Sequence, residues 1–279
     1  MRRYKTGKPA AYDNDISVHK DLSLKDKLTS QQLAFIMTTP DWIVGCILLG
    51  GVLFSIGKKK LTVPAAIIGA LIGCIVYAGG GLTGLAMMTV FFILGTAATS
   101  WKKENKLHIG QHAAHQQTRS VSQVLANAGV AGLAGLLNLL WKGHEPLPEI
   151  AMAGSLASAA ADTLASELGM LYGRRFYNIL TGKPDRKGLD GVVSIEGLLI
   201  GTLAAAIIAG VYMLGRGWNG PVFLIIVASG TLGNLLDSIL GATLERKGRC
   251  GNNMVNFSNT LAAAIIAGVL YGLTTRGFS

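Results

Sequence analysis

Long runs of apolar residues alternate along this chain with short polar segments, starting at residue 42. Each run is close to the roughly 20 residues that an α-helix needs to cross the hydrocarbon core of a bilayer. The runs are continuous and do not alternate between apolar and polar positions, which excludes a transmembrane β-barrel. The pattern predicts eight membrane helices, over residues 42–57, 61–78, 82–100, 121–141, 150–172, 192–214, 222–244 and 257–273.

The composition agrees with a membrane protein. Only 14% of the 279 residues are charged and 50% are hydrophobic, whereas soluble domains carry about 25% charged residues. The 37 glycines lie mostly inside the apolar runs, where they allow helices to pack closely in lipid. We therefore expect an all-α fold, a polytopic bundle of about seven to eight transmembrane helices. Residues 1–40 would form a polar N-terminal tail, and residues 41–279 a single integral-membrane domain.

The basic residues are distributed unevenly over the connecting segments. Lys and Arg are concentrated after the first, third, fifth and seventh predicted helices, and the other connections and the C-terminus hold only Lys142, Arg216 and Arg276. Because cytosolic loops are enriched in these residues, we expect the four basic segments to face the cytosol, in a bacterial or archaeal inner membrane. The basic tail would then lie outside, unless the first run does not span the bilayer. Short basic loops between helices favour anionic lipid or phosphorylated substrates as partners over nucleic acid.

Small and polar side chains form one stripe on the helix predicted over residues 150–172. Spaced three or four residues apart, its members are Ser155, Ser158, Asp162, Ser166, Gly169 and Gly173. A charged residue in hydrocarbon costs roughly 3 kcal/mol on insertion scales, so we expect Asp162 to face the bundle interior. There it would line a cytosol-facing cavity or clamp a packing seam. Glu167, on a neighbouring face, would support the site or pair with a loop arginine.

The seventh predicted helix repeats this design. Gly230, Gly233, Asp237 and Gly241 form a second stripe of small residues with one carboxylate in it. If the two stripes meet, Asp162 and Asp237 repel each other unless a cation lies between them. Mg²⁺ prefers oxygen ligands and is commonly held by one or two carboxylates together with substrate phosphates. We therefore predict a Mg²⁺ site at this pair.

The segment between these helices, TGKPDRKGLDGVVSIEG at residues 181–197, has the features of an anion site. Gly188 and Gly191 let backbone N–H groups approach a ligand closely. Asp190 or Ser194 would cap the following helix, whose N-terminus attracts anions. Lys183 adds positive charge before this helix. An ordinary basic loop is the alternative.

Two further polar faces point inward. Arg119, Gln123 and Asn127 are spaced by four residues on the fourth predicted helix. Asn252, Asn256 and Asn259 share a face at the start of the eighth. Amides in lipid need partners, so each face is either a packing clamp or a wall of the site.

Four segments resemble a known family. RSVSQVLANAGVAG, ADTLASELG, GVVSIEGLLIG and GNLLDSILGATLERKG occur here in the order and approximate spacing of the integral-membrane family that includes the plant phytyl-phosphate kinase. The resemblance covers residues 42–273. The family is distantly similar to the dolichol and phytol kinases and phosphatidate cytidylyltransferase, whose Asp-x-x-Ala-x-x-x-Gly helix is matched by Asp162, Ala165 and Gly169. The loop pattern of the integral-membrane family is altered in this chain at three positions, where Lys187, Leu189 and Val192 replace Pro, Thr and Gly.

The resemblance implies a Mg²⁺-dependent kinase. It would transfer a phosphoryl group from a nucleoside triphosphate, with CTP as the expected donor, to an isoprenyl monophosphate such as phytyl or geranylgeranyl phosphate. We expect Asp162, Asp237 and Lys183 to act in catalysis, with both aspartates on the metal. The expected substrate- and nucleotide-binding residues are Arg119, Asn127, Ser166, Arg174, Gly188, Asp190, Gly191, Ser194 and Asn256.

Two other functions fit the same pattern. A cytidylyltransferase that makes a CDP-lipid would share the site and differ in which phosphate is attacked. An ion-coupled transporter would also use intramembrane carboxylates on glycine-rich helices. The expected partners are the isoprenyl phosphate, the nucleotide and membrane lipids, without nucleic acid, and assembly into a homo-oligomer stays open.

Overall fold

The computed structural model describes residues 41–102, 104–105, 118–141 and 146–276. The predicted tail, residues 1–40, lies outside the described residues. The chain divides into two compact units, Met1–Leu48 and Leu49–Ser279. The described part of the first unit is the first half of one helix, residues 41–48.

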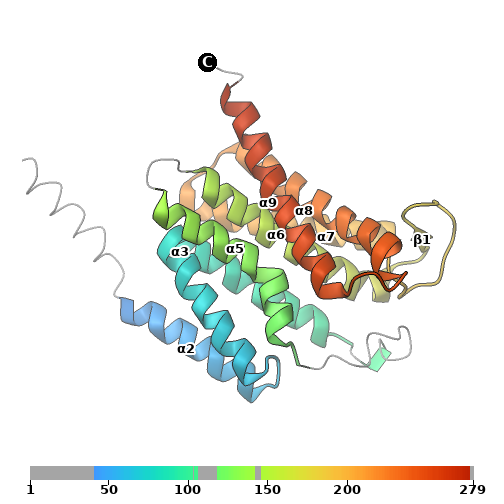
Figure 1. Cartoon of the computed structure of the whole chain (residues 1–279), viewed down its shortest axis with the longest axis horizontal. Coiled ribbons are helices and arrows are strands. Elements are labelled where there is room, and N and C mark those ends of the chain that lie inside the picture. Colours follow the sequence, from blue (N-terminus) through green and yellow to red (C-terminus); the bar gives the residue numbers. More distant parts are fainter. Residues whose placement is uncertain (1–40, 103, 106–117, 142–145, 277–279) are drawn as a thin grey trace, which may run out of the picture. The chain divides into compact units, whose positions relative to one another are not determined.

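The described residues form an all-α fold with seven helices (Figure 1). Their bounds are α2 Asp41–Gly57, α3 Val63–Ser100, α5 Val121–Leu140, α6 Leu147–Tyr172, α7 Ile195–Arg216, α8 Gly220–Leu240 and α9 Asn252–Arg276. Within the described part of the chain, five helical stretches are long and apolar enough to cross a membrane, and a shorter apolar helix spans Trp42–Gly57. The all-α prediction is therefore confirmed, with one minor addition, a pair of two-residue strands at Tyr177–Asn178 (β1) and Val192–Val193 (β2).

α3 consists of two helical segments joined at Gly81, whose φ of 61° and ψ of −157° are not helical. The two segments fold back on each other. Lys60, just before α3, donates through Nζ to Ser100 Oγ at its end over 2.7 Å. A Cβ on Gly84 would lie 2.9 Å from the carbonyl oxygen of Val76, although eight residues of straight helix span about 12 Å. The two separate runs predicted over 61–78 and 82–100 are thus confirmed as two antiparallel segments.

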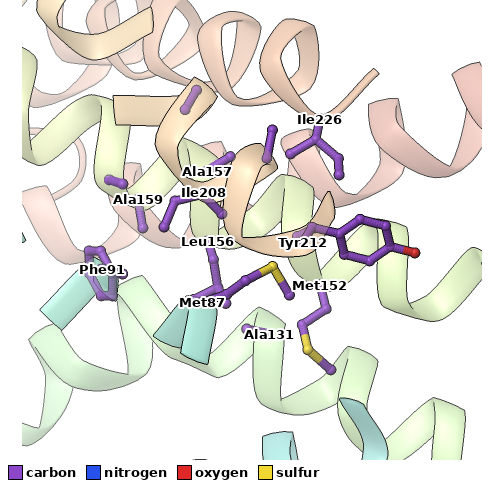
Figure 2. Close-up of a cluster of buried hydrophobic side chains, with 14 of the residues drawn as sticks. Met87, Phe91, Ala131, Met152, Leu156, Ala157, Ala159, Ile208, Tyr212 and Ile226 are labelled. Carbon is purple, nitrogen blue, oxygen red and sulfur yellow. The ribbon is translucent and has the colours of Figure 1, made fainter. Parts of the chain in front are cut away.

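α6 is the central helix of the bundle and packs against α3, α5, α7, α8 and α9. Ile150, Met152 and Leu156 are fully buried. Figure 2 shows Met152, Leu156 and Ala157 of α6 among apolar side chains from the surrounding helices, including Met87, Phe91, Ala131, Ile208, Tyr212 and Ile226. α6 is not one of the five apolar stretches. Because other helices shield it from lipid, it tolerates many small and polar residues.

The two predicted small-residue stripes meet between α6 and α8. A Cβ on Gly230 would lie 2.7 Å from Ala157 Cβ, and one on Gly233 would collide with Ser158 Oγ. Only glycine allows so close an approach of the two backbones. Asp162 and Asp237 follow Ser158 and Gly233 by four residues, which is one helical turn. The close crossing therefore sets where both carboxylates lie.

The described basic segments meet at one end of the bundle. Lys60 lies beside Arg119, whose N–H donates to the Lys60 carbonyl over 2.9 Å. Arg246 pairs with Asp185 over 2.7 Å, and Asn253 at the start of α9 donates to Ser122 at the start of α5 over 2.9 Å. We call this the basic end. At the opposite end, Arg216 pairs with Glu149 and donates to the carbonyl oxygen of Gly80 over 3.2 Å.

Helix starts at the basic end differ from the predicted ones. α7 begins at Ile195 and not at 192, because Ser194 accepts a hydrogen bond from the Gly197 N–H over 3.1 Å. Val192 and Val193 instead pair with β1. The prediction of Ser194 as a helix cap is confirmed. α9 begins at Asn252 and not at 257, which brings the predicted asparagine face into the first turns of a helix.

Candidate active site

A cavity of about 660 Å³ opens among the helix ends at the basic end of the bundle. Side chains of α3, α5, α6, α7, α8 and α9 line it, together with the segment that precedes α7. Its wall contains most of the polar residues singled out in the sequence. The cavity is therefore the natural candidate for an active site.

Two carboxylates from different helices face each other in this cavity. The side chains of Asp162 on α6 and Asp237 on α8 lie close enough to share a hydrogen bond. Both residues are partly buried and line the cavity wall. Two carboxyl groups at this separation repel each other unless a proton or a cation lies between them.

The asparagine face of α9 holds Asp237 in place. Asn259 donates through Nδ2 to Asp237 Oδ1 over 2.6 Å, and its own Oδ1 accepts from Ser158 over 3.1 Å. Asn256, with its amide nitrogen turned toward the carboxylate, donates to Asp237 Oδ1 over 3.3 Å and to Asn252 Oδ1 over 2.8 Å. The neighbouring donors and acceptors favour this amide orientation. Two amide side chains of α9 therefore donate to the Asp237 carboxylate, and Asn252 accepts a hydrogen bond from one of them.

The carboxylate pair fits Mg²⁺ that arrives with a phosphate ligand. Within the described residues, no group of three or more His, Cys, Asp or Glu side chains could hold a metal ion by itself. Mg²⁺ nevertheless binds commonly through one or two carboxylates, with water and phosphate oxygens completing its shell. Asp162 and Asp237 offer such a set, because both present carboxylate oxygens as metal ligands and lie next to each other in the cavity wall.

The segment before α7 forms a second part of the wall. Gly188 and Gly191 have φ values of 82° and 73°, a left-handed backbone that glycine adopts without strain. Gly191 accepts a hydrogen bond from the Ile179 N–H over 3.0 Å, and a Cβ there would collide with Ala242. Both glycines line the cavity together with Asp190 and Ser194. The backbone of this segment is thus pressed against the end of α8.

An ion pair outside the membrane helices anchors the same segment. Arg246 donates through Nη1 to Asp185 Oδ2 over 2.7 Å, and this bond lowers the pKa of Asp185 to about 2. The same bond raises the pKa of Arg246. Because Asp185 also accepts from Arg186 N–H over 2.8 Å, the carboxylate is held in one position.

A turn of π-helix at Gly241–Glu245 ends α8. Such turns are rare and often occur at functional sites. Here it brings Glu245 into the cavity wall and Gly241 against the backbone of Gly191, whose nitrogen would lie 3.1 Å from a Cβ on Gly241.

Lys60 and Arg119 form the cationic part of the wall. The Arg119 N–H donates to the Lys60 carbonyl, and the Arg119 carbonyl accepts from the Thr62 N–H over 3.1 Å. These two backbone hydrogen bonds hold Arg119 beside the segment that contains Lys60. Arg119 Nη2 lies 3.5 Å from Thr99 Oγ1. Burial lowers the pKa of Arg119, and the charge of Glu167 opposes this effect. The interaction favours the predicted pairing of Glu167 with a loop arginine.

Comparison with known proteins agrees with the motif resemblance. The family model of the integral membrane protein DUF92 matches residues 46–269. The chain belongs to the DUF92 family. It is 31% identical to the uncharacterized membrane protein sll0875 of Synechocystis over 88% of this chain and 96% of that protein. It is 32% identical to the uncharacterized membrane protein MJ0933 of Methanocaldococcus jannaschii over 77% of this chain and 88% of that protein.

A plant protein belongs to the same group of relatives. The chain is 27% identical to Protein VTE6, chloroplastic, of Arabidopsis thaliana, over 78% of this chain and 67% of that protein. No solved structure matches the chain. The resemblance inferred from four motifs is therefore confirmed at the level of the family.

In this DUF92 protein the cavity gathers most of the residues predicted for the site. The lining includes Asp162, Asp237, Arg119, Asn127, Ser166, Gly188, Asp190, Gly191, Ser194 and Asn256. Asn127 Oδ1 and Asn234 Nδ2, both in the wall, are buried and lack a hydrogen-bond partner among the described residues. A polar ligand would satisfy such groups.

Two predicted residues lie outside the cavity wall. Lys183 is exposed and sits in a turn, where its carbonyl accepts from the Asn178 N–H over 2.9 Å. Arg174 is exposed as well, and its N–H donates to Glu196 Oε2 over 3.3 Å. The antiparallel pairing of Tyr177 with Val193 makes the segment a short hairpin. Phe176 and the strand Val192–Val193 line the cavity, whereas the turn that holds Lys183 does not. Lys60, which the sequence showed only as part of a basic loop, lines the cavity instead.

Proposed function

We propose that this DUF92 protein is a membrane lipid kinase. It transfers a phosphoryl group from a nucleoside triphosphate, with CTP as the expected donor, to an isoprenyl monophosphate such as phytyl or geranylgeranyl phosphate. The observation that supports this function best is the placement of Asp162 and Asp237 opposite each other in a cavity whose wall also contains Lys60 and Arg119. The family resemblance supplies the reaction class.

The proposed reaction requires no covalent intermediate with the protein. An oxygen of the lipid phosphate forms a bond to the γ-phosphorus, the bond from this phosphorus to the β–γ bridging oxygen breaks, and the nucleoside diphosphate leaves with the electron pair. The acceptor is already ionised, so no general base is required. Catalysis then depends on positioning and on stabilisation of negative charge.

The residues of the cavity suit these two tasks. Asp162 and Asp237 would hold Mg²⁺, which when bound neutralises the negative charge of the donor phosphates. The segment from Gly188 to Ser194 lines the same space, and its glycines would let a phosphate approach the backbone closely. Arg119 and Lys60 stabilise negative charge on the other part of the wall.

The membrane arrangement follows from the same geometry. We place the basic end on the cytosolic side, because Lys and Arg are enriched in cytosolic loops. Each half of α3 then crosses the bilayer, and α6 crosses it inside the ring of the other helices. The phosphates would lie at the membrane surface, and the isoprenyl chain would remain in lipid.

A double-label assay tests the function. Purified protein in detergent is incubated with geranylgeranyl monophosphate, Mg²⁺ and CTP labelled at either the α- or the γ-phosphate. A γ-label in the lipid product supports the kinase. An α-label retained in the lipid would instead establish a cytidylyltransferase. If neither label enters the lipid with any isoprenyl phosphate or nucleoside triphosphate, the enzyme proposal is wrong and an ion-coupled carrier becomes the better hypothesis.

A further inference from the structure

The cavity has two chemically different walls on neighbouring faces of α6. Asp162 faces α8 and α9, where Asp237 and Asn259 lie. The next residue, Thr163, faces α3, because a Cβ on Gly95 would lie 3.5 Å from Thr163 Cγ2. Successive residues of a helix differ in direction by about 100°. We call the side of Asp162 and Asp237 the acidic wall, and the side of Lys60 and Arg119 the cationic wall.

Backbone and side-chain contacts hold the cationic wall in place. Lys60 and Arg119 are 59 positions apart in the chain but are linked by the hydrogen bond from Arg119 N–H to the Lys60 carbonyl. Gly95 leaves room for the guanidinium, whose Nη2 would lie 3.2 Å from a Cβ at that position. Three hydroxyl side chains of α3 line the cavity beside the two cations, those of Thr96, Thr99 and Ser100.

The charge of this wall is positive even with its acidic neighbour included. Lys60 and Arg119 carry two positive charges, and Glu167 carries one negative charge close to Arg119. The remaining positive charge suits a small anion, and the hydroxyl groups hold the two cations in place, because Ser100 Oγ accepts from Lys60 Nζ over 2.7 Å and Thr99 Oγ1 lies 3.5 Å from Arg119 Nη2. A guanidinium and an ammonium group are the side chains that bind phosphate most often.

We propose that Lys60 and Arg119 form a subsite for the phosphate monoester of the acceptor lipid, apart from the acidic wall that takes the polyphosphate of the donor. The inference rests on the proposed function for the identity of the acceptor and adds the residues that recognise it. The subsite lies where α3 ends and α5 begins. Phe92 borders it inside the cavity, and Ile93 and Leu125 are exposed on the outer faces of the same helices. A lipid bound there keeps its phosphate in the cavity and its apolar chain in the bilayer.

A binding experiment without nucleotide tests this subsite. Full-length protein in detergent is titrated with geranylgeranyl monophosphate and, separately, with geranylgeraniol in a calorimeter. Lys60→Gln should weaken binding of the monophosphate by about tenfold, as expected for a lost hydrogen bond to a charged group. Binding of the alcohol should not change. Lys60→Arg should retain affinity, and Lys58→Gln, an exposed lysine outside the cavity, should behave as the wild type.

Arg119 provides a second variant. Arg119→Lys keeps the charge but loses the planar pair of donors, so binding of the monophosphate should also weaken. Arg175→Lys, at an exposed position outside the cavity, is the control. The proposal is overturned if the wild type does not bind the monophosphate. It is equally overturned if Lys60→Gln binds the monophosphate normally or loses affinity for the alcohol to the same extent.

Titration with Mg²⁺ and CTP in the absence of lipid separates the acceptor from the donor. Lys60→Gln should bind the nucleotide as the wild type does. If nucleotide binding weakens while lipid binding is retained, the cationic wall serves the donor and the proposal is wrong. If the wild type binds the monophosphate through Lys60 yet transfers no label from any nucleotide, the kinase function fails and the subsite stands.

Discussion

Asn259 donates a 2.6 Å hydrogen bond to Asp237 Oδ1 while its own carbonyl oxygen accepts from Ser158. One buried amide on α9 thus connects the carboxylate of α8 to the central helix α6. Asn259 is 1% exposed, so water cannot replace either bond. The orientation of Asp237 in the cavity therefore depends on the packing of three helices.

Removing this amide should affect both the site and the fold. Asn259→Ala leaves the buried Asp237 oxygen without its short bond, which should lower the free energy of unfolding by about 1–3 kcal/mol. Because the carboxylate loses its orientation, the apparent affinity for Mg²⁺ should fall by roughly 10- to 100-fold. The measurements are thermal unfolding in detergent and phosphoryl transfer as a function of Mg²⁺ concentration. Asn253→Ala, which removes a more exposed bond from the same helix to Ser122, should leave the Mg²⁺ dependence unchanged. An identical Mg²⁺ dependence in both variants would contradict the positioning role.

The carboxylate pair should be essential for turnover and dispensable for folding. Asp162→Asn and Asp237→Asn keep the side-chain volume and remove one negative charge each. We expect phosphoryl transfer to fall by roughly 100-fold or more, as for other groups that stabilise transition-state charge. Monodisperse elution and an unchanged helical circular dichroism spectrum would show that the variants are folded. Glu104→Gln, at an exposed position outside the cavity, serves as the control. Near-wild-type turnover in both aspartate variants would refute the assignment of the metal site.

Two glycines with positive φ in the same segment allow a matched comparison. Gly191 has φ of 73° and Gly182 has φ of 64°, so alanine at either position costs roughly 1–2 kcal/mol of backbone strain. Only at Gly191 would the added Cβ also collide with Ala242, because the space around Gly182 is open. Gly191→Ala should therefore be less stable than Gly182→Ala in thermal unfolding. It should also lose activity, since the cavity wall is displaced. Equal losses in the two variants would show that the contact with α8 has no role.

The ion pair between Asp185 and Arg246 predicts a dependence of stability on pH. Folding lowers the pKa of Asp185 from 3.8 to about 2. The bond therefore stabilises the fold fully at pH values above the unfolded pKa, and its contribution is lost as the pH falls toward 2. The difference in melting temperature between the wild type and Asp185→Asn should be constant from pH 6 to 8 and should shrink below about pH 4. A difference that changes between pH 6 and 8 would implicate another titrating group.

The sequence alone predicts most of the fold. Within the described residues, each of the eight predicted runs coincides with a helical segment, because a segment in lipid must satisfy its own backbone groups. Five of the described helical stretches are long and apolar enough to cross a membrane, and Trp42–Gly57 is shorter. Even the break in α3 falls between the predicted runs, at the glycine triplet that ends with Gly81. The start of α9 at Asn252 was missed because apolarity marks the part of a helix inside lipid and not its polar first turn. The start of α7 was predicted too early because the apolar Val192 and Val193 pair with β1 and do not join the helix.

The site was only partly predictable. Helical periodicity placed Asp162 and Asp237 on small-residue faces, and such faces in lipid pack together. Periodicity does not say which helix lies opposite, however, and the roles of Lys60 and Asn259 depend on that. Lys183 and Lys60 look alike in the sequence, as members of basic loops. Only the hairpin that keeps Lys183 exposed and the backbone bridge that holds Lys60 beside Arg119 distinguish them.

The sequence by itself thus determined the membrane class, the approximate extent of the described helices and the inward placement of Asp162 and Asp237. These properties follow from local spacing and from the cost of exposing polar groups to lipid. The tertiary structure decided that α6 lies at the centre, that its two neighbouring faces meet an acidic and a cationic wall, and that Asn259 joins three helices. Those relationships arise from contacts between residues far apart in the chain, which the spacing within one helix does not specify.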